Sequence, residues 1–139
     1  MGTIALDPAT AKDNPTGATE FYWGNGLDAG WAIDDPDGLV FVNPPYGRNI
    51  TSKWTAKMAY EGRLGVEIIG LLPARPSTIW WHDHVLQADA LAFFKGRIRF
   101  AGADSGAPFP SVLVYWGRRK ARFHEIFNPR SWVVMLDER

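Results

Sequence analysis

Two almost wholly apolar runs, Leu39–Val42 and residues 66–72, constrain the fold of this chain more than any other feature of its sequence. Such a run is typical of a strand that is covered on both faces, as strands are in a parallel sheet. Residues 50–61 lie between the two runs and contain good helix formers, and Gly62 follows them as a stop signal. The order strand, helix, strand predicts an α/β fold with a mainly parallel sheet.

The same rules place the remaining elements. We expect further strands at 4–6, 90–94, 111–116 and 132–136, and helices at 77–87 and 119–127. Residues 8–38 are rich in Gly, Pro, Asp and Asn, so they predict mostly loop with room for one helical turn. The acids between 34 and 37 are expected to be turn residues. With 139 residues, 46% of them hydrophobic, the chain predicts a single packed domain, 1–139.

Several function classes are excluded by composition. The chain has no cysteine, which rules out disulfides, thiolate zinc sites and cysteine nucleophiles. No apolar run approaches the length of a membrane span, and the start of the chain lacks the pattern of a signal peptide. We therefore expect a soluble, cytoplasmic protein with no membrane partner. His82 and His84 stand two positions apart, so on a helix they would not share a face, and no metal site is expected.

Charge is unevenly distributed although the formal net charge is +0. Residues 1–43 hold seven acids and one base, whereas residues 95–122 hold seven bases and one acid. A neutral total can therefore include a basic surface that suits phosphates. The candidate DNA-binding residues are Arg75, Lys95, Arg97, Arg99, Arg118, Arg119 and Lys120. For Arg75, contact with a phosphate, contact with a cofactor carboxylate and a structural ion pair remain open.

Candidate site residues follow the ends of predicted strands. Asp7, Asn43, Pro73 and Arg75 each come just after such an end. In open α/β sheets ligands bind beyond the carboxyl ends of the strands, so we expect these residues to share one edge of the sheet.

The sequence Asn43-Pro44-Pro45-Tyr46 directly follows the strand Leu39–Val42. An amino group on an aromatic base is a poor nucleophile, because its lone pair is delocalised into the ring. Two acceptors aimed at its hydrogens favour the charge that develops during attack, and the Asn43 side chain and the Pro44 carbonyl can supply them. The two prolines stiffen the loop and remove N–H donors. Tyr46 offers a flat face for a base that has been flipped out of a duplex.

With these residues, the chain resembles the phage DNA N6-adenine methyltransferases of the Dam type over nearly its whole length. The segments that carry the resemblance are Leu6-Asp7-Pro8-Ala9, Phe21-Tyr22, Gly26-Leu27, Val42-Asn43-Pro44-Pro45-Tyr46-Gly47, Leu71-Leu72-Pro73-Ala74-Arg75, Trp80-Trp81-His82, Lys95-Gly96-Arg97-Ile98-Arg99-Phe100 and Ala107-Pro108-Phe109-Pro110-Ser111.

The resemblance implies a compact class I, Rossmann-like methyltransferase fold with a mainly parallel sheet and an antiparallel C-terminal strand. It implies S-adenosylmethionine as cofactor and double-stranded DNA as partner. It makes Asn43, Pro44, Pro45 and Tyr46 catalytic, and it makes Asp7, Asn25 and Asn43 cofactor contacts. The chain departs from the family in two respects: the usual helical segment before the first strand is not present, and Asn25 stands where the family tends to have Asp.

Two alternatives stay open. The same loop chemistry serves methyl transfer to another planar amine or amide, such as an RNA base or a protein glutamine. The chain could also be a non-catalytic remnant that binds only DNA or a partner methyltransferase. The basic residues and the extent of the resemblance favour DNA. We further expect a homo-oligomer, and we expect either low sequence specificity or specificity supplied by residues 101–110 or by a second subunit.

Overall fold

The computed structural model describes residues 1–96 and 109–137, which form one mixed sheet with helices on both of its faces. The strands are β1 (Thr3–Asp7), β2 (Glu20–Phe21), β3 (Gly38–Val42), β4 (Ile68–Pro73), β5 (Ala90–Phe94), β6 (Ser111–Trp116) and β7 (Ser131–Met135). The α-helices are α1 (Thr51–Arg63), α2 (Ile79–Asp83) and α3 (Lys120–Phe127), and short 3₁₀ turns are η1 (Gly26–Asp28), η2 (Val85–Gln87) and η3 (Asn128–Arg130). The predicted strands, and the helices at 50–61 and 119–127, are confirmed with ends shifted by a few residues. The helix predicted at 77–87 is shorter: α2 ends at Asp83, and the 3₁₀ turn η2 follows it.

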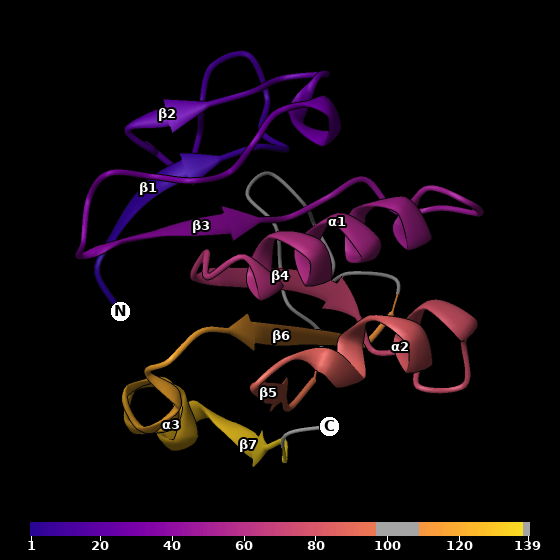
Figure 1. Ribbon diagram of the computed structural model, residues 1–139. Helices are drawn as coiled ribbons and strands as arrows, with labels where there is room; N and C mark the ends of the chain where they lie inside the picture. The colour runs from indigo at the N-terminus through magenta and orange to yellow at the C-terminus, as the bar shows by residue number, and fades with distance from the viewer. Residues whose placement is uncertain (97–108, 138–139) are drawn as a thin grey trace.

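The strand order is β2-β1-β3-β4-β6-β5-β7 (Figure 1). The first four strands of this order pair in parallel, whereas β6 is antiparallel to β4 and β5, and β7 is antiparallel to β5. The expectation of an antiparallel C-terminal strand is confirmed for β7. Because β6 is antiparallel as well, half of the pairings between described strands are antiparallel, and the sheet is mixed instead of mainly parallel. An apolar run predicts burial on two faces whichever way the strand points, so the sequence could not give the direction of β6.

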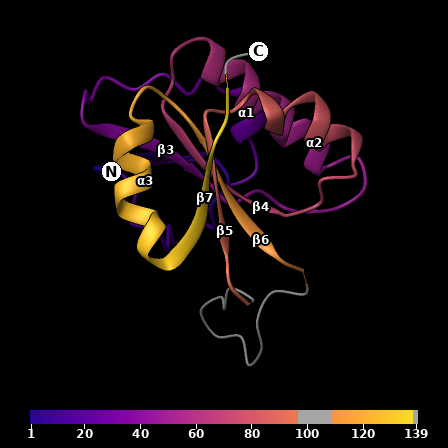
Figure 2. The same cartoon turned by 90° about the horizontal axis from the view of Figure 1, so that it is seen from below.

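Two apolar layers cover the sheet. Helices α1 and α2 lie on one face, and α3 lies on the other (Figure 2). Along β6 the side chains alternate between these layers: Val112 and Val114 pack on the α1 and α2 side, and Leu113 and Tyr115 pack on the α3 side. This alternation is what a strand covered on both faces requires.

The N-terminal segment between β1 and β3 is held down by one buried aromatic residue. Trp31 is fully buried, its indole N–H donates to the Gly26 carbonyl at 2.9 Å, and its ring stacks on Trp54 of α1 at 6.2 Å. Its backbone N–H donates to the buried carboxylate of Glu61 at 3.0 Å. Lys57 pairs with the same carboxylate at 3.4 Å. The buried charge is therefore both hydrogen-bonded and paired, as burial of a carboxylate requires.

Candidate active site

The carboxyl ends of β1, β3 and β4 meet at one edge of the sheet, because the three strands are parallel neighbours (Figure 1). Asp7, Asn43 and Pro73 stand at these ends, which confirms the expectation that they share an edge. The segment 43–46 leaves the end of β3 and separates two cavities at this edge.

The first cavity, the β1 cavity, has a volume of about 640 Å³. It lies between the segment after β1 and the segment after β3. Its lining comprises Pro8, Ala9, Thr10, Ala11, Gly24, Leu27, Asn43, Pro44, Pro45, Tyr46 and Trp54. Trp54 and Leu27 give it apolar walls. The hydroxyl of Thr10 is buried and has no hydrogen-bond partner among the described residues.

The second cavity, the α2 cavity, lies on the other side of Tyr46 and has a volume of about 400 Å³. Its lining comprises Tyr46, Gly47, Arg48, Thr51, Pro73, Arg75, Thr78, Trp80 and Phe109. A groove of about 580 Å³ shares Arg48, Thr78 and Trp80 with it and continues toward the start of α2. Tyr46 is thus a common wall of the β1 cavity and the α2 cavity.

Tyr46 is held in place by polar and aromatic contacts. Its hydroxyl oxygen lies 2.8 Å from Oδ1 of Asn43 and 2.7 Å from the carbonyl oxygen of Leu71. Burial raises the pKa of the Tyr46 hydroxyl, so the phenol keeps its proton at neutral pH. Its ring meets Phe109 edge to face at 5.0 Å, and the guanidinium of Arg75 lies over Phe109 at 5.6 Å. The exposed Arg75 therefore stands at the mouth of the α2 cavity.

The loop after Tyr46 is also fixed locally. The Thr51 hydroxyl oxygen accepts the N–H of Gly47 at 3.1 Å at the start of α1. Gly47 adopts a φ of +154° and Asn49 a φ of +65°, so the chain turns sharply there before the helix begins. This turn brings Arg48 into the lining of the α2 cavity.

Asp7 and Asn25 lie beside the β1 cavity without lining it. Asp7 is 2% exposed, and its carboxylate accepts the N–H of Ala9 at 3.2 Å and the hydroxyl of Thr16 at 2.7 Å. These bonds shape the segment that follows β1. Asn25 is exposed, and its neighbour Gly24 lines the cavity.

The candidate DNA-binding residues fall into two separate groups. Arg75 and Lys95 follow β4 and β5, which run the same way because both are antiparallel to β6. Both residues therefore lie at the edge that holds Asn43. Arg97 and Arg99 lie outside the described residues.

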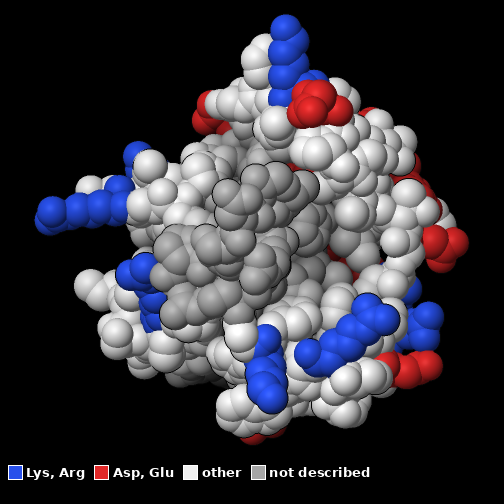
Figure 3. Space-filling view, turned by 180° about the vertical axis from the view of Figure 1, so that it is seen from behind, with Lys and Arg blue, Asp and Glu red and all other residues white. Residues whose placement is uncertain are grey.

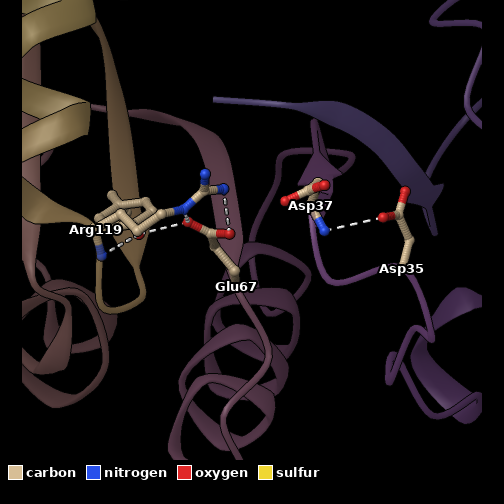
Figure 4. Close-up of polar contacts among 5 residues, drawn as sticks. Asp35, Asp37, Glu67 and Arg119 are labelled. Atoms are coloured by element: carbon tan, nitrogen blue, oxygen red, sulfur yellow. Dashed lines mark hydrogen bonds and ion pairs between the residues drawn. The ribbon is translucent and has the colours of Figure 1, made fainter.

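Arg118, Arg119 and Lys120 lie at the opposite edge, because β6 is antiparallel and they follow its end. Arg119 pairs with Glu67 at 2.7 Å beside Tyr115 (Figure 4). The Lys120 ammonium donates to the Leu136 carbonyl at 2.8 Å. On the face seen in Figure 3, basic side chains stand at several separate places around the described surface. The structure thus does not bring the two groups together.

Other predictions from the sequence concern turns and metals. Asp35 accepts the N–H of Asp37 at 2.9 Å, which confirms that the acids before β3 are turn residues (Figure 4). Nε2 of His82 lies 2.8 Å from the Pro76 carbonyl oxygen. Within residues 1–96 and 109–137, no group of three or more acidic or histidine side chains could hold a metal ion. No helix in the same residues is long and apolar enough to cross a membrane.

Thr10 and Arg48 line the cavities but were not singled out by the sequence. Trp80 and Phe109 entered only as parts of motifs. Each comes from a loop or a short helix, where no periodic pattern indicates which side chain faces a cavity.

Comparison with known protein families gives one match. The family model described as DNA N-6-adenine-methyltransferase (Dam) matches residues 1–126. Neither a curated protein nor a solved structure matches the chain significantly.

Proposed function

This chain belongs to the DNA N-6-adenine-methyltransferase (Dam) family, and we propose that it transfers a methyl group from S-adenosylmethionine to the N6 amino group of adenine in double-stranded DNA. The observation that carries the proposal is the position of Asn43-Pro44-Pro45-Tyr46. The loop follows a buried strand and forms the wall between two cavities at the carboxyl edge of the sheet. A methyl donor and a methyl acceptor need such adjoining sites.

The β1 cavity is the proposed donor site. Its volume of about 640 Å³ lies in the range of small-molecule sites. Trp54 and Leu27 suit the apolar parts of a nucleoside, and the unpartnered hydroxyl of Thr10 suits a polar group of the ligand. The residues present therefore fit S-adenosylmethionine, which when bound supplies a methyl group on a positively charged sulfur.

Asp7 and Asn25 take secondary roles in this proposal. Asp7 does not line the β1 cavity, and its two carboxylate oxygens accept from Ala9 and Thr16, so we propose that it chiefly shapes the wall of this cavity. Asn25 would contact the donor from the rim beside Gly24.

The α2 cavity is the proposed site of the extruded adenine. Tyr46, Phe109 and Trp80 offer aromatic surface for the base. Asn43 and Pro44 line the β1 cavity and not the α2 cavity, so we propose that the amino group reaches past the edge of Tyr46, where the Asn43 side-chain oxygen and the Pro44 carbonyl accept its two hydrogens. These acceptors favour the positive charge that develops as nitrogen attacks the methyl carbon.

Several finer assignments belong to the same proposal. We propose a class I methyltransferase fold, because the cavities lie at the carboxyl ends of parallel strands, where ligands bind in sheets of this kind. We propose that Arg48, Arg75 and Lys95 contact phosphates of the target duplex. Arg118 could contact DNA only at the edge of the sheet opposite Asn43. At that edge Arg119 pairs with Glu67, and Lys120 donates to the Leu136 carbonyl.

The test is methylation of unmethylated duplex DNA with labelled S-adenosylmethionine, followed by digestion to nucleosides. We expect N6-methyldeoxyadenosine from the native chain. Asn43→Ala should lower kcat by at least about a hundredfold, in line with the loss of one preorganised transition-state contact. Donor binding, measured by calorimetry, should be weakened much less.

Other outcomes separate the alternatives. No product from DNA with donor binding intact, and product from single-stranded RNA or a protein, would replace adenine in DNA as the substrate. No donor binding at all would favour a non-catalytic remnant.

A further inference from the structure

The hydroxyl of Tyr46 stands between two oxygen positions but carries only one proton. It lies 2.7 Å from the Leu71 carbonyl oxygen and 2.8 Å from Oδ1 of Asn43. A hydroxyl donates one hydrogen bond and can accept others. The two neighbours cannot both receive its proton, so one contact must have the opposite direction.

The pairing of β3 with β4 shows which neighbour needs the proton. Val40 donates its N–H to the Glu67 carbonyl, and the register pairs Val42 with Gly70. Two residues further along a parallel ladder, the N–H of residue 44 would reach the Leu71 carbonyl. Residue 44 is a proline and has no N–H. The Tyr46 hydroxyl therefore occupies the donor position that Pro44 leaves empty.

The backbone carbonyl of Leu71 can only accept, whereas the Asn43 carboxamide can donate or accept. Half a turn about the Cβ–Cγ bond of Asn43 exchanges its oxygen and nitrogen and leaves every other atom in place. With the amide nitrogen toward Tyr46, both contacts become hydrogen bonds. With the oxygen toward Tyr46, two acceptors face one proton.

We infer that the Tyr46 hydroxyl is a positioning group: it donates to the Leu71 carbonyl, accepts from Nδ2 of Asn43, and so keeps Oδ1 of Asn43 free for the substrate amino group. We call this chain of contacts from Leu71 through Tyr46 to Asn43 the relay. It rests on the proposed function only where it assigns Oδ1 of Asn43 to the substrate amino group. It gives Tyr46 a role that its ring cannot perform, since a phenylalanine ring would stack on a base equally well. It also couples the reactive asparagine to the end of β4.

The experiment combines kinetics with the spectrum of the side-chain amides. Tyr46→Phe keeps the ring and removes the hydroxyl, and Tyr60→Phe, at an exposed position on α1, is the matched control. We expect Tyr46→Phe to lower kcat about tenfold to a hundredfold, as a slightly misplaced reacting group does, with KM for DNA nearly unchanged. Tyr60→Phe should match the native chain. An unchanged kcat in Tyr46→Phe would overturn the inference.

The second readout does not depend on catalysis. The chain has five asparagines and one glutamine, so its side-chain NH₂ signals are few and can be assigned with Asn43→Ala in a ¹⁵N-labelled sample. In the native chain one Nδ2 proton of Asn43 should exchange more slowly than those of exposed Asn25, and that protection should disappear in Tyr46→Phe alone. An Asn43 amide that exchanges as fast as that of Asn25 would refute the relay. A native chain without methylation activity would remove the proposed function, and this spectrum would still decide the relay.

Discussion

Pro44 has a second consequence at the scale of single residues. Its missing N–H ends the ladder between β3 and β4, so the chain can leave the sheet where the reactive loop must begin. A residue with an N–H at this position could pair with the Leu71 carbonyl and compete with the Tyr46 hydroxyl. The second proline, Pro45, stiffens the same turn. The two prolines thus set the course of the backbone after β3, and Pro44 leaves the Leu71 carbonyl free to accept from the Tyr46 hydroxyl.

Thr10 provides a prediction at the same scale. Its buried hydroxyl lacks a partner among the described residues and lies in the wall of the β1 cavity. Thr10→Val should therefore weaken donor binding up to about tenfold, the usual worth of one hydrogen bond, while leaving the free energy of unfolding unchanged or slightly raised. Calorimetric titration with S-adenosylhomocysteine and urea unfolding measure the two effects.

The exposed Thr19 is a suitable control, and Thr19→Val should change neither quantity. Equal donor affinity in Thr10→Val and the native chain would mean that the hydroxyl does not serve the donor.

The sequence predicted the position of the segment 43–46 at the end of a buried strand, because Asn43 and Tyr46 form a contiguous pattern after the run Leu39–Val42. Arg48 and Thr10 could not be predicted in this way. Their part in the cavities depends on the turn at Gly47 and on the course of the segment after Asp7, which are set by tertiary hydrogen bonds. For Asp7, the sequence placed the residue but could not show that its carboxylate is engaged by Thr16.

At the scale of elements, helix α1 does more than cover the sheet. Its Glu61 and Trp54 hold Trp31, and through it the segment that supplies Gly24 and Leu27 to the β1 cavity. The helix therefore connects the packing of the core to the shape of the proposed donor site.

Glu61 gives the corresponding prediction. Glu61→Ala leaves the buried N–H of Trp31 without a partner and should lower the free energy of unfolding by about 1–3 kcal/mol. Glu61→Gln keeps a carbonyl acceptor for the Trp31 N–H and loses only the pair with Lys57, so it should cost less than Glu61→Ala. Urea unfolding followed by tryptophan fluorescence gives both values. Equal losses in the two variants would show that the ion pair, and not the acceptor, holds the segment.

Elements were well predicted where apolar runs or helix formers were continuous, as in β3, α1 and β6. The two-residue strand β2 was not predicted. It consists of Glu20 and Phe21, both exposed, and it forms only because these residues reach the end of β1. A contact of this kind leaves no periodic pattern in the sequence.

At the scale of the whole molecule, the basic residues are divided between two ends of the sheet. Arg75 and Lys95 share the edge with the segment 43–46, and Arg118 lies at the other edge. The sequence could not reveal this division, because it depends on the direction of β6.

The division predicts different responses to salt. Arg75→Ala and Lys95→Ala should each weaken DNA binding and reduce the slope of log affinity against log salt concentration by about 0.9, the value for one phosphate contact. Arg118→Ala should leave the slope unchanged. Fluorescence anisotropy with a short labelled duplex over a range of salt concentrations measures all three. A reduced slope in Arg118→Ala alone would place the duplex at the opposite edge.

Tyr46 is a wall of both cavities, and a shared wall makes the two binding events energetically dependent on each other. A molecule in one cavity that moves this ring changes the shape of the other cavity, because the ring bounds both. Such coupling is reciprocal. If a ligand in the β1 cavity changes the affinity of the α2 cavity by some factor, a ligand in the α2 cavity changes the affinity of the β1 cavity by the same factor. One tyrosine ring thereby gives a small chain the means to be cooperative within a single protomer.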